Sequence, residues 1–132
     1  MRTYRKLLTL EALSGVADIS VRYLREEIRD GGLLAIRIGL REYRVTYEDA
    51  RAYLSSRVSD DRLELLQVIS PVIIPRAHVA LKCADVAAFL DVSRQHVRNM
   101  LRSGDWGGLV LMSTIRISHS RLADFLSTHR TG

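Results

Sequence analysis

The sequence of 132 residues is poor in cysteine, proline, lysine and aromatic residues. Its single cysteine, Cys83, cannot form an intramolecular disulfide, and no cluster of cysteine and histidine has the spacing of a zinc site. No apolar segment reaches the ~18 residues that a membrane-spanning helix needs. The sequence therefore argues against a disulfide scaffold and a zinc module, and we expect neither a bound metal nor a membrane partner.

Motifs for catalysis are also missing from the sequence. No glycine-rich phosphate loop follows a predicted strand, and His78, His119 and His129 lack a carboxylate or nucleophile in a local motif. Basic residues near the N-terminus are not followed by an apolar run of signal-peptide length. We therefore expect no enzymatic activity and no cofactor, and we expect a cytoplasmic, nucleoid-associated protein.

What the chain does contain is apolar residues and arginine. Hydrophobic residues make up 47% of the sequence and charged residues 27%, which is typical of a folded soluble protein. The net charge is +5, and 18 of the 20 basic residues are arginine. Arginine carries a planar fork of donors that suits phosphates and guanine edges. From the charge alone, binding to nucleic acid and no such binding are about equally favoured.

An internal repeat is the strongest pattern in the sequence. At an offset of 73 residues Ser20 aligns with Ser93 and Gly31 with Gly104, and at an offset of 72 Tyr53 aligns with Phe125. The change of offset places one gained or lost residue between Gly39 and Thr114, where a hairpin tip would tolerate it. We predict two copies of one small domain, at residues 1–57 and 79–132, joined by a connector at residues 58–78.

Each copy has the same order of predicted elements. Helices at 11–17 and 84–90 have apolar stripes, and each is followed by a tight turn. Ser20 and Ser93 are placed to cap a second helix that ends at Gly31 or Gly104. β-type residues interrupted by turn formers then predict hairpins at 35–45 and 109–117, and a last helix begins after Thr46 or Ser118. The predicted fold is mainly α with small β-hairpins, in the α+β class.

The helix-turn-helix run from residue 84 to 105 resembles that of the MerR-like and phage excisionase superfamily of winged helix-turn-helix domains. The hairpin at 36–39 and 43–46, with the helix around 52–54, is similar to the wing and closing helix of that family. The resemblance covers residues 7–57 and 79–130. It implies tandem winged-helix domains that bind double-stranded DNA, with the second helix in the major groove and the wing on the backbone or minor groove. It implies no catalytic activity.

Candidate DNA-binding residues are polar side chains on the second helices, at their caps and on the hairpins. Arginine can read guanine, and glutamine or asparagine can read adenine, mainly from the first turns of such a helix. In the second copy the candidates are Ser93, Arg94, Gln95, His96, Arg98, Asn99, Thr114 and Arg116. In the first copy they are Ser20, Arg22, Tyr23, Arg25, Arg37, Arg41 and Arg44.

The alternative to DNA contact differs between the two second helices. In the second copy it is an ordinary solvated face, which we give less weight because only Asp105 is acidic nearby. In the first copy Glu26 and Glu27 would repel phosphate, and Arg22 could pair with Glu26 within the helix. We therefore weigh DNA contact and salt bridging evenly for that helix.

The connector differs in charge from both copies. Residues 58–78 carry a net charge of −1, and each flanking copy carries +3. Residues 63–69 predict a short helix that ends before Pro71, followed by an apolar stretch at 72–74. We expect the connector to face away from DNA and to pack the copies together, or to mediate self-association through residues 63–74.

These features predict a sequence-specific double-stranded DNA-binding protein. Its expected role is that of a transcriptional regulator or of an excisionase-like architectural factor in recombination, with RNA polymerase or a recombinase as its protein partner. One alternative is the DNA-recognition subunit of a larger assembly, of the phage small terminase or plasmid partition type. The other is a protein-interaction module that has lost DNA binding.

Overall fold

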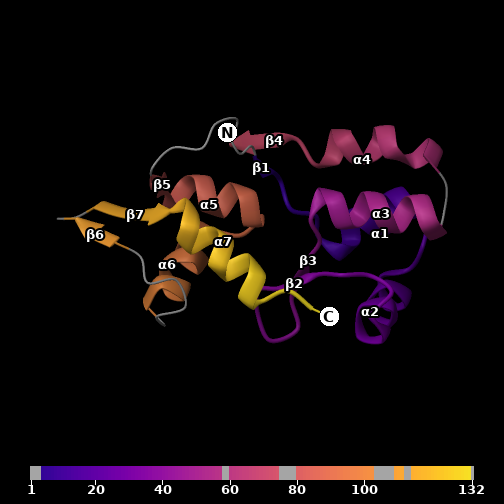
Figure 1. Ribbon diagram of the computed structural model, residues 1–132, viewed down its shortest axis with the longest axis horizontal. Helices are drawn as coiled ribbons and strands as arrows, with labels where there is room; N and C mark the ends of the chain where they lie inside the picture. Colours follow the sequence, from indigo (N-terminus) through magenta and orange to yellow (C-terminus); the bar gives the residue numbers. More distant parts are fainter. Residues whose placement is uncertain (1–3, 58–59, 75–79, 103–108, 112–113, 132) are drawn as a thin grey trace.

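The computed structural model of the chain describes residues 4–57, 60–74, 80–102, 109–111 and 114–131, and it is mainly helical with small antiparallel strand pairs (Figure 1). This confirms the predicted α+β class at that level. In the described ranges, no helix is both long enough and apolar enough to cross a membrane.

The first repeat has the predicted order of helix, turn, helix, hairpin and helix. Thr9 caps the first helix, and Ser20 Oγ caps the second by accepting a hydrogen bond from the Tyr23 N–H at 3.1 Å. The second helix ends at Gly31, whose φ of 84° is in the left-handed region that favours glycine. The elements are β1 (Tyr4–Arg5), α1 (Leu10–Ala17), α2 (Val21–Asp30), β2 (Ile36–Arg37), β3 (Tyr43–Arg44) and α3 (Tyr47–Arg57).

The second repeat follows the same order. Ser93 Oγ accepts a hydrogen bond from the His96 N–H at 3.0 Å, as the predicted cap requires. Gly104, the predicted end of that helix, lies outside the described residues. The elements are β5 (Ala80–Lys82), α5 (Cys83–Leu90), α6 (Arg94–Arg102), β6 (Leu109–Leu111), β7 (Thr114–Ser118) and α7 (His119–Thr128), with the strands in the order β5-β7-β6.

Strand registers match the two offsets of the sequence repeat. The isolated bridge between Leu8 and Val45 corresponds to the Leu81–Ile117 pair of the second repeat. In the hairpins, Ile36 pairs with Arg44 as Leu109 pairs with Arg116. Asp18 and Asp91, which follow the first helices, both have a positive φ, of 57° and 56°. The two repeats therefore share a local structure, and the one-residue difference in length falls in the hairpin tip.

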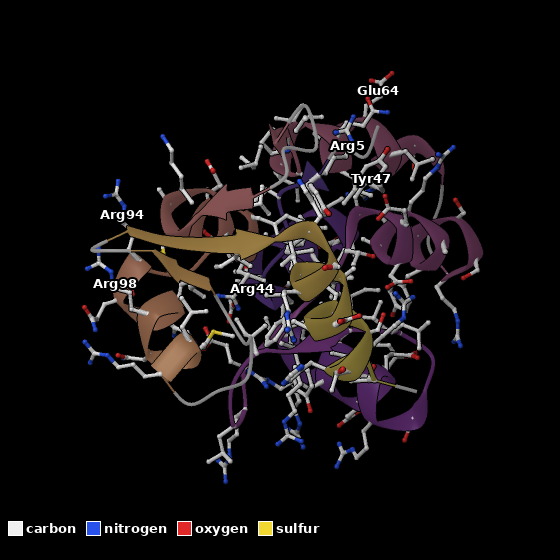
Figure 2. The ribbon with its side chains drawn as sticks, turned by 60° about the vertical axis from the view of Figure 1, so that its left-hand side comes forward. Arg5, Arg44, Tyr47, Glu64, Arg94 and Arg98 are labelled. Atoms are coloured by element: carbon white, nitrogen blue, oxygen red, sulfur yellow. The ribbon has the colours of Figure 1, made fainter. Side chains whose placement is uncertain are left out.

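The connector contains a 3-10 turn (Asp60–Arg62), helix α4 (Leu63–Ile69) and strand β4 (Val72–Ile74), which pairs antiparallel with β1. Leu66 is buried in the core of the first repeat, and Ile73 packs against the core of the second. Arg5 fixes this arrangement, since it donates to the Ser70 carbonyl at 2.8 Å and lies over the Tyr47 ring (Figure 2). The expectation that the connector packs against both copies is confirmed.

The two hydrophobic cores are not confined to their own repeats. The core of the second repeat also buries side chains from the first repeat and its N-terminal strand: Tyr4, Leu7, Ile36 and Ile38. Ile36 and Ile38 come from the first hairpin and its tip, so this hairpin packs against the core of the second repeat. Apolar burial of this kind contributes roughly 1.5–3 kcal/mol for each large side chain. The repeats are therefore fused by their packing as well as by the connector.

The C-terminal residues complete the contact between the repeats. Arg37 N–H donates to the His129 carbonyl at 2.9 Å, and Thr131 N–H donates to the Ala35 carbonyl at 2.8 Å. Arg130 forms an ion pair with Asp49 of α3, with 2.6 Å between Nη2 and Oδ1. Residues 129–131 thus run beside β2, on the edge that β3 leaves open. This cover gives β2 a partner on each of its edges.

Candidate nucleic-acid interface

A basic groove of ≈ 550 Å³ lies between α2 and the first hairpin. The residues that line it include four arginines and no acidic residue. Two of the arginines come from α2 and two from the hairpin, because both elements turn their polar side toward the same space. The lining residues are Arg25, Ile28, Arg29, Arg37, Leu40, Arg41, Tyr43 and Thr131. Such a concentration of positive charge suits a polyanion.

Two of the four arginines of this basic groove, Arg25 and Arg37, are held by the hairpin. Arg25 Nη1 donates to the Arg41 carbonyl at 3.0 Å, and its guanidinium lies 6.0 Å from the centre of the Tyr43 ring. Arg37 donates to the Gly39 carbonyl at 3.3 Å and also to the Leu40 carbonyl. Each guanidinium has five N–H donors, so several of them are left for a ligand. Two of the four charges are thus positioned before any ligand arrives.

The acidic residues of α2 oppose this field less than the sequence suggested. Glu27 was expected to repel phosphate, but its side chain turns inward, is buried and lies 3.5 Å from Arg57 Nη1. Gly32 allows this, because a Cβ at position 32 would lie 2.0 Å from Glu27 Oε2. Glu26 lies 3.8 Å from Arg22, which is the salt bridge weighed evenly against DNA contact for this helix. Glu27 is therefore not on the solvent-facing side of α2, where the expected repulsion would place it.

Three candidate residues at the start of α2 are exposed. Ser20 serves as the cap, and Arg22 is tied only by its long ion pair to Glu26. Tyr23 is 47% exposed, and a hydrogen bond to the Glu27 carboxylate, together with the charge of Glu27, raises the pKa of the Tyr23 hydroxyl. The hydroxyl therefore stays neutral, and Tyr23 adds no negative charge to this surface.

Arg44 is not on the surface of the hairpin, contrary to the prediction that it contacts DNA. Only 6% of it is exposed, and its guanidinium donates to the carbonyls of Leu90 at 2.8 Å and Asp91 at 2.9 Å. It also pairs with Glu42, at 3.1 Å. Leu90 and Asp91 form the C-terminal end of α5, where a cation is favourable. Figure 2 shows Arg44 inside the molecule, well away from Arg94 and Arg98.

Helix α6 presents the polar face that the sequence predicted. Val97 and Met100 are buried, and Arg94, Gln95, Arg98 and Asn99 are exposed. Gln95 donates to Asn99 Oδ1 at 3.0 Å, whereas Arg94 and Arg98 have no such partner among the described residues. Figure 2 shows Arg94 and Arg98 pointing away from the body of the protein. His96 is half-buried, and its backbone N–H belongs to the helix cap.

Thr114 and Arg116, the predicted candidates on the second hairpin, lie in β7. Arg116 pairs in register with Leu109 on one side and Lys82 on the other. Their side chains lie outside the described residues. The contribution of these two residues to DNA contact therefore stays a prediction.

The candidate elements gather on one side of the protein. In both views α2, the tip of the first hairpin and α6 lie in the lower half, and α4 lies at the top (Figures 1 and 2). A second groove, of ≈ 320 Å³, separates the hairpin tip from α6 and α7; Leu40, Met100 and Phe125 are among its lining residues. The hairpin tip is therefore a ridge between two grooves.

Sequence reasoning left two features of this surface out of the candidate set. Arg29 is an attractive residue of this helix in the sequence but was not made a candidate; it lines the basic groove one helical turn after Arg25, on the same face. Leu40 was passed over because apolar residues are not usual candidates for DNA contact. In the described residues, no group of three or more histidine, cysteine, aspartate or glutamate side chains could hold a metal ion.

Comparisons of the chain with protein families, with curated proteins and with solved structures find no match. The function is therefore inferred from the residues and their geometry.

Proposed function

We propose that the protein binds double-stranded DNA in a sequence-specific manner through two tandem winged helix-turn-helix units. The observation that carries the proposal is the basic groove between α2 and the first hairpin, with its four arginines and no acidic lining residue. Its expected role is that of a transcriptional regulator or of an excisionase-like architectural factor, with RNA polymerase or a recombinase as partner. It acts by occupying or bending its site.

In this proposal the phosphate backbone enters the basic groove. Arg25, Arg29, Arg37 and Arg41 neutralise phosphates there, which supplies affinity without sequence information. Base reading falls to α6, where Arg94 and Arg98 can pair with guanine O6 and N7, and Gln95 or Asn99 with adenine N6 and N7. Helix α4, which carries Glu64, lies on the opposite side, where this carboxylate does not oppose the phosphates.

A fluorescence anisotropy titration with DNA selected from a random duplex pool tests the proposal. Four phosphate contacts predict a slope of about −4 in a plot of log affinity against log salt. The double substitution Arg29→Ala and Arg41→Ala should reduce that slope by about 2, since each lost phosphate contact removes roughly one counterion. Arg51→Ala, an exposed arginine of α3 outside the groove, is the matched control and should change nothing. Equal affinity of all three proteins at every salt concentration contradicts the proposal.

A second candidate is the DNA-recognition subunit of a larger assembly. It is favoured by three exposed apolar residues of the connector: Leu65 at 52%, Val68 at 76% and Val72 at 44% exposed. Val72 lies on β4, which pairs with β1 alone among the described strands, so its other edge could pair with β4 of a second copy. Sedimentation of the wild type and of Val68→Asp tests this: a monomer in both cases contradicts it.

A further inference from the structure

Leu40 at the tip of the first hairpin is the most exposed large apolar residue of the described chain. Its exposed fraction is 83%, whereas its neighbour Ile38 is buried in the second core. A single exposed leucine is by itself unremarkable on a protein surface. Leu40 differs from such a residue because hydrogen bonds hold the backbone around it and arginines lie beside it.

The tip that carries Leu40 is braced on both sides. Arg37 donates to the carbonyls of Gly39 and Leu40, and Arg25 from α2 donates to the carbonyl of Arg41. Ile38 N–H donates to the Glu42 carbonyl at 2.9 Å and closes the loop below the tip. The backbone on each side of Leu40 is therefore fixed, and its side chain stays in water because no neighbour covers it.

Leu40 also stands on the ridge between the two grooves, since it lines both of them. Arg37 and Arg41 flank it in the sequence, and Arg37 likewise lines both grooves. An apolar side chain set among arginines is the combination with which proteins enter the minor groove: arginines are attracted by its negative potential, and the apolar group separates stacked bases.

We propose that Leu40 is a wedge that enters the minor groove of the bound duplex, inserts between two adjacent base pairs and kinks the DNA toward the major groove. This inference rests on the proposed function, because it needs a duplex in the basic groove. The expected kink is in the range of about 20–90° that such insertions produce. Flexible pyrimidine–purine steps should be preferred at the kink.

The other exposed apolar residues do not fit this role. Leu65, Val68 and Val72 belong to α4 and β4, which lie on the side of the protein opposite α2 and the tip of the first hairpin (Figures 1 and 2). Tyr23 of α2 does not line the basic groove, and a hydrogen bond ties its hydroxyl to Glu27. Within the described residues, Leu40 is thus the apolar side chain that combines exposure, support and basic neighbours.

Two measurements on the full chain test the wedge. The first is end-to-end energy transfer in a roughly 30-base-pair duplex that contains the selected site, because a kink shortens its end-to-end distance. The second places 2-aminopurine at successive positions of that site, because its fluorescence rises where a base is unstacked. With the wild type we expect increased energy transfer and brightening at one base step.

The substitution Leu40→Ala should remove both signals and weaken binding by no more than about tenfold, because the arginine contacts remain. Leu40→Met should retain both signals, and Leu65→Ala, an exposed leucine on the far side, serves as the control that changes neither. A bend that persists in Leu40→Ala, or a wild-type complex with a straight duplex, overturns the wedge and leaves the proposed function intact. Absence of DNA binding by the wild type overturns both.

Discussion

The two repeats have the same local structure but carry different chemistry on it. In the first repeat the charge is concentrated at the hairpin and at α2 beside it, where Arg25 and Arg37 are bonded to hairpin carbonyls. In the second repeat the polar side chains stand out on α6, and Arg94 and Arg98 are exposed. Duplicated units can thus divide two tasks, because a fold sets positions and the side chains set the chemistry.

The difference between the two repeats follows from the way the first hairpin contacts the second repeat. The C-terminal residues 129–131 run beside β2, and Ile36 and Ile38 enter the second core. The first hairpin is therefore supported from two directions. In the second hairpin β7 also pairs with β5, whereas β6 pairs only with β7 among the described strands. A rigid hairpin is the better place for a fixed array of arginines, whereas a helix can present base-reading side chains without outside support.

The largest expected effect tests whether the repeats are one folding unit. Ile36→Ala removes a side chain that is 1% exposed and should lower the free energy of unfolding by about 2–5 kcal/mol. Trp106 is the only tryptophan and belongs to the second repeat in sequence, so its fluorescence follows that repeat. We expect urea transitions by fluorescence and by circular dichroism to shift together.

The control for this experiment is Leu40→Ala, which removes a leucine of the same hairpin that is 83% exposed and should change stability by less than about 0.5 kcal/mol. Two separate transitions, with the fluorescence transition unmoved by Ile36→Ala, would show that the repeats fold independently.

A half-turn insertion in the DNA tests whether the fused repeats bind at one fixed spacing. Two recognition helices in successive major grooves on one face lie about 34 Å apart, so the footprint should cover roughly 20 base pairs. Five inserted base pairs turn one half-site to the opposite face. Affinity should then fall about 100-fold, because the fused repeats can no longer both contact one face of the duplex. A ten-base-pair insertion restores the face but doubles the spacing, so repeats held at one fixed distance should lose affinity there as well. Indifference to the five-base-pair insertion would mean that the repeats act independently.

Single substitutions separate base reading from phosphate binding. Arg94→Ala, Gln95→Ala or Arg98→Ala should cost about 1–3 kcal/mol of binding free energy and relax preference at one base position. Arg41→Ala should weaken all sequences alike. The measurement is competition of each variant between the selected site and random duplex. Equal losses on both DNAs for all four variants would remove the division of tasks between α6 and the first hairpin.

The sequence predicted local structure well because local signals fix it. The two serine caps, Ser20 and Ser93, and the helix end at Gly31 depend only on residues nearby in the sequence. The sequence did not predict that Arg44 and Glu27 are buried, because burial of a charged group depends on a distant partner. That partner is the end of α5 for Arg44, and Arg57 for Glu27. The basic groove was predicted in part, because the hairpin arginines were named but their arrangement with α2 was not.

The smallest effects concern the two serine caps, which should be equal in the two repeats. Ser20→Ala and Ser93→Ala each remove an acceptor for a helix N–H, at 3.1 Å and 3.0 Å, and should each cost about 1 kcal/mol of folding stability. Aspartate is an equally good cap, so Ser20→Asp and Ser93→Asp should retain the stability of the wild type.

The aspartate variants also distinguish capping from contact with phosphate. A new carboxylate at a helix N-terminus repels a phosphate that approaches the same N–H groups. If Ser93 lies at the DNA backbone, Ser93→Asp should remain folded and lose affinity on specific and random duplex alike. Thermal unfolding and anisotropy titration of the same samples check the two expectations. A stable Ser93→Asp protein with unchanged affinity would place the DNA away from the start of α6 and limit Ser93 to its role as a cap.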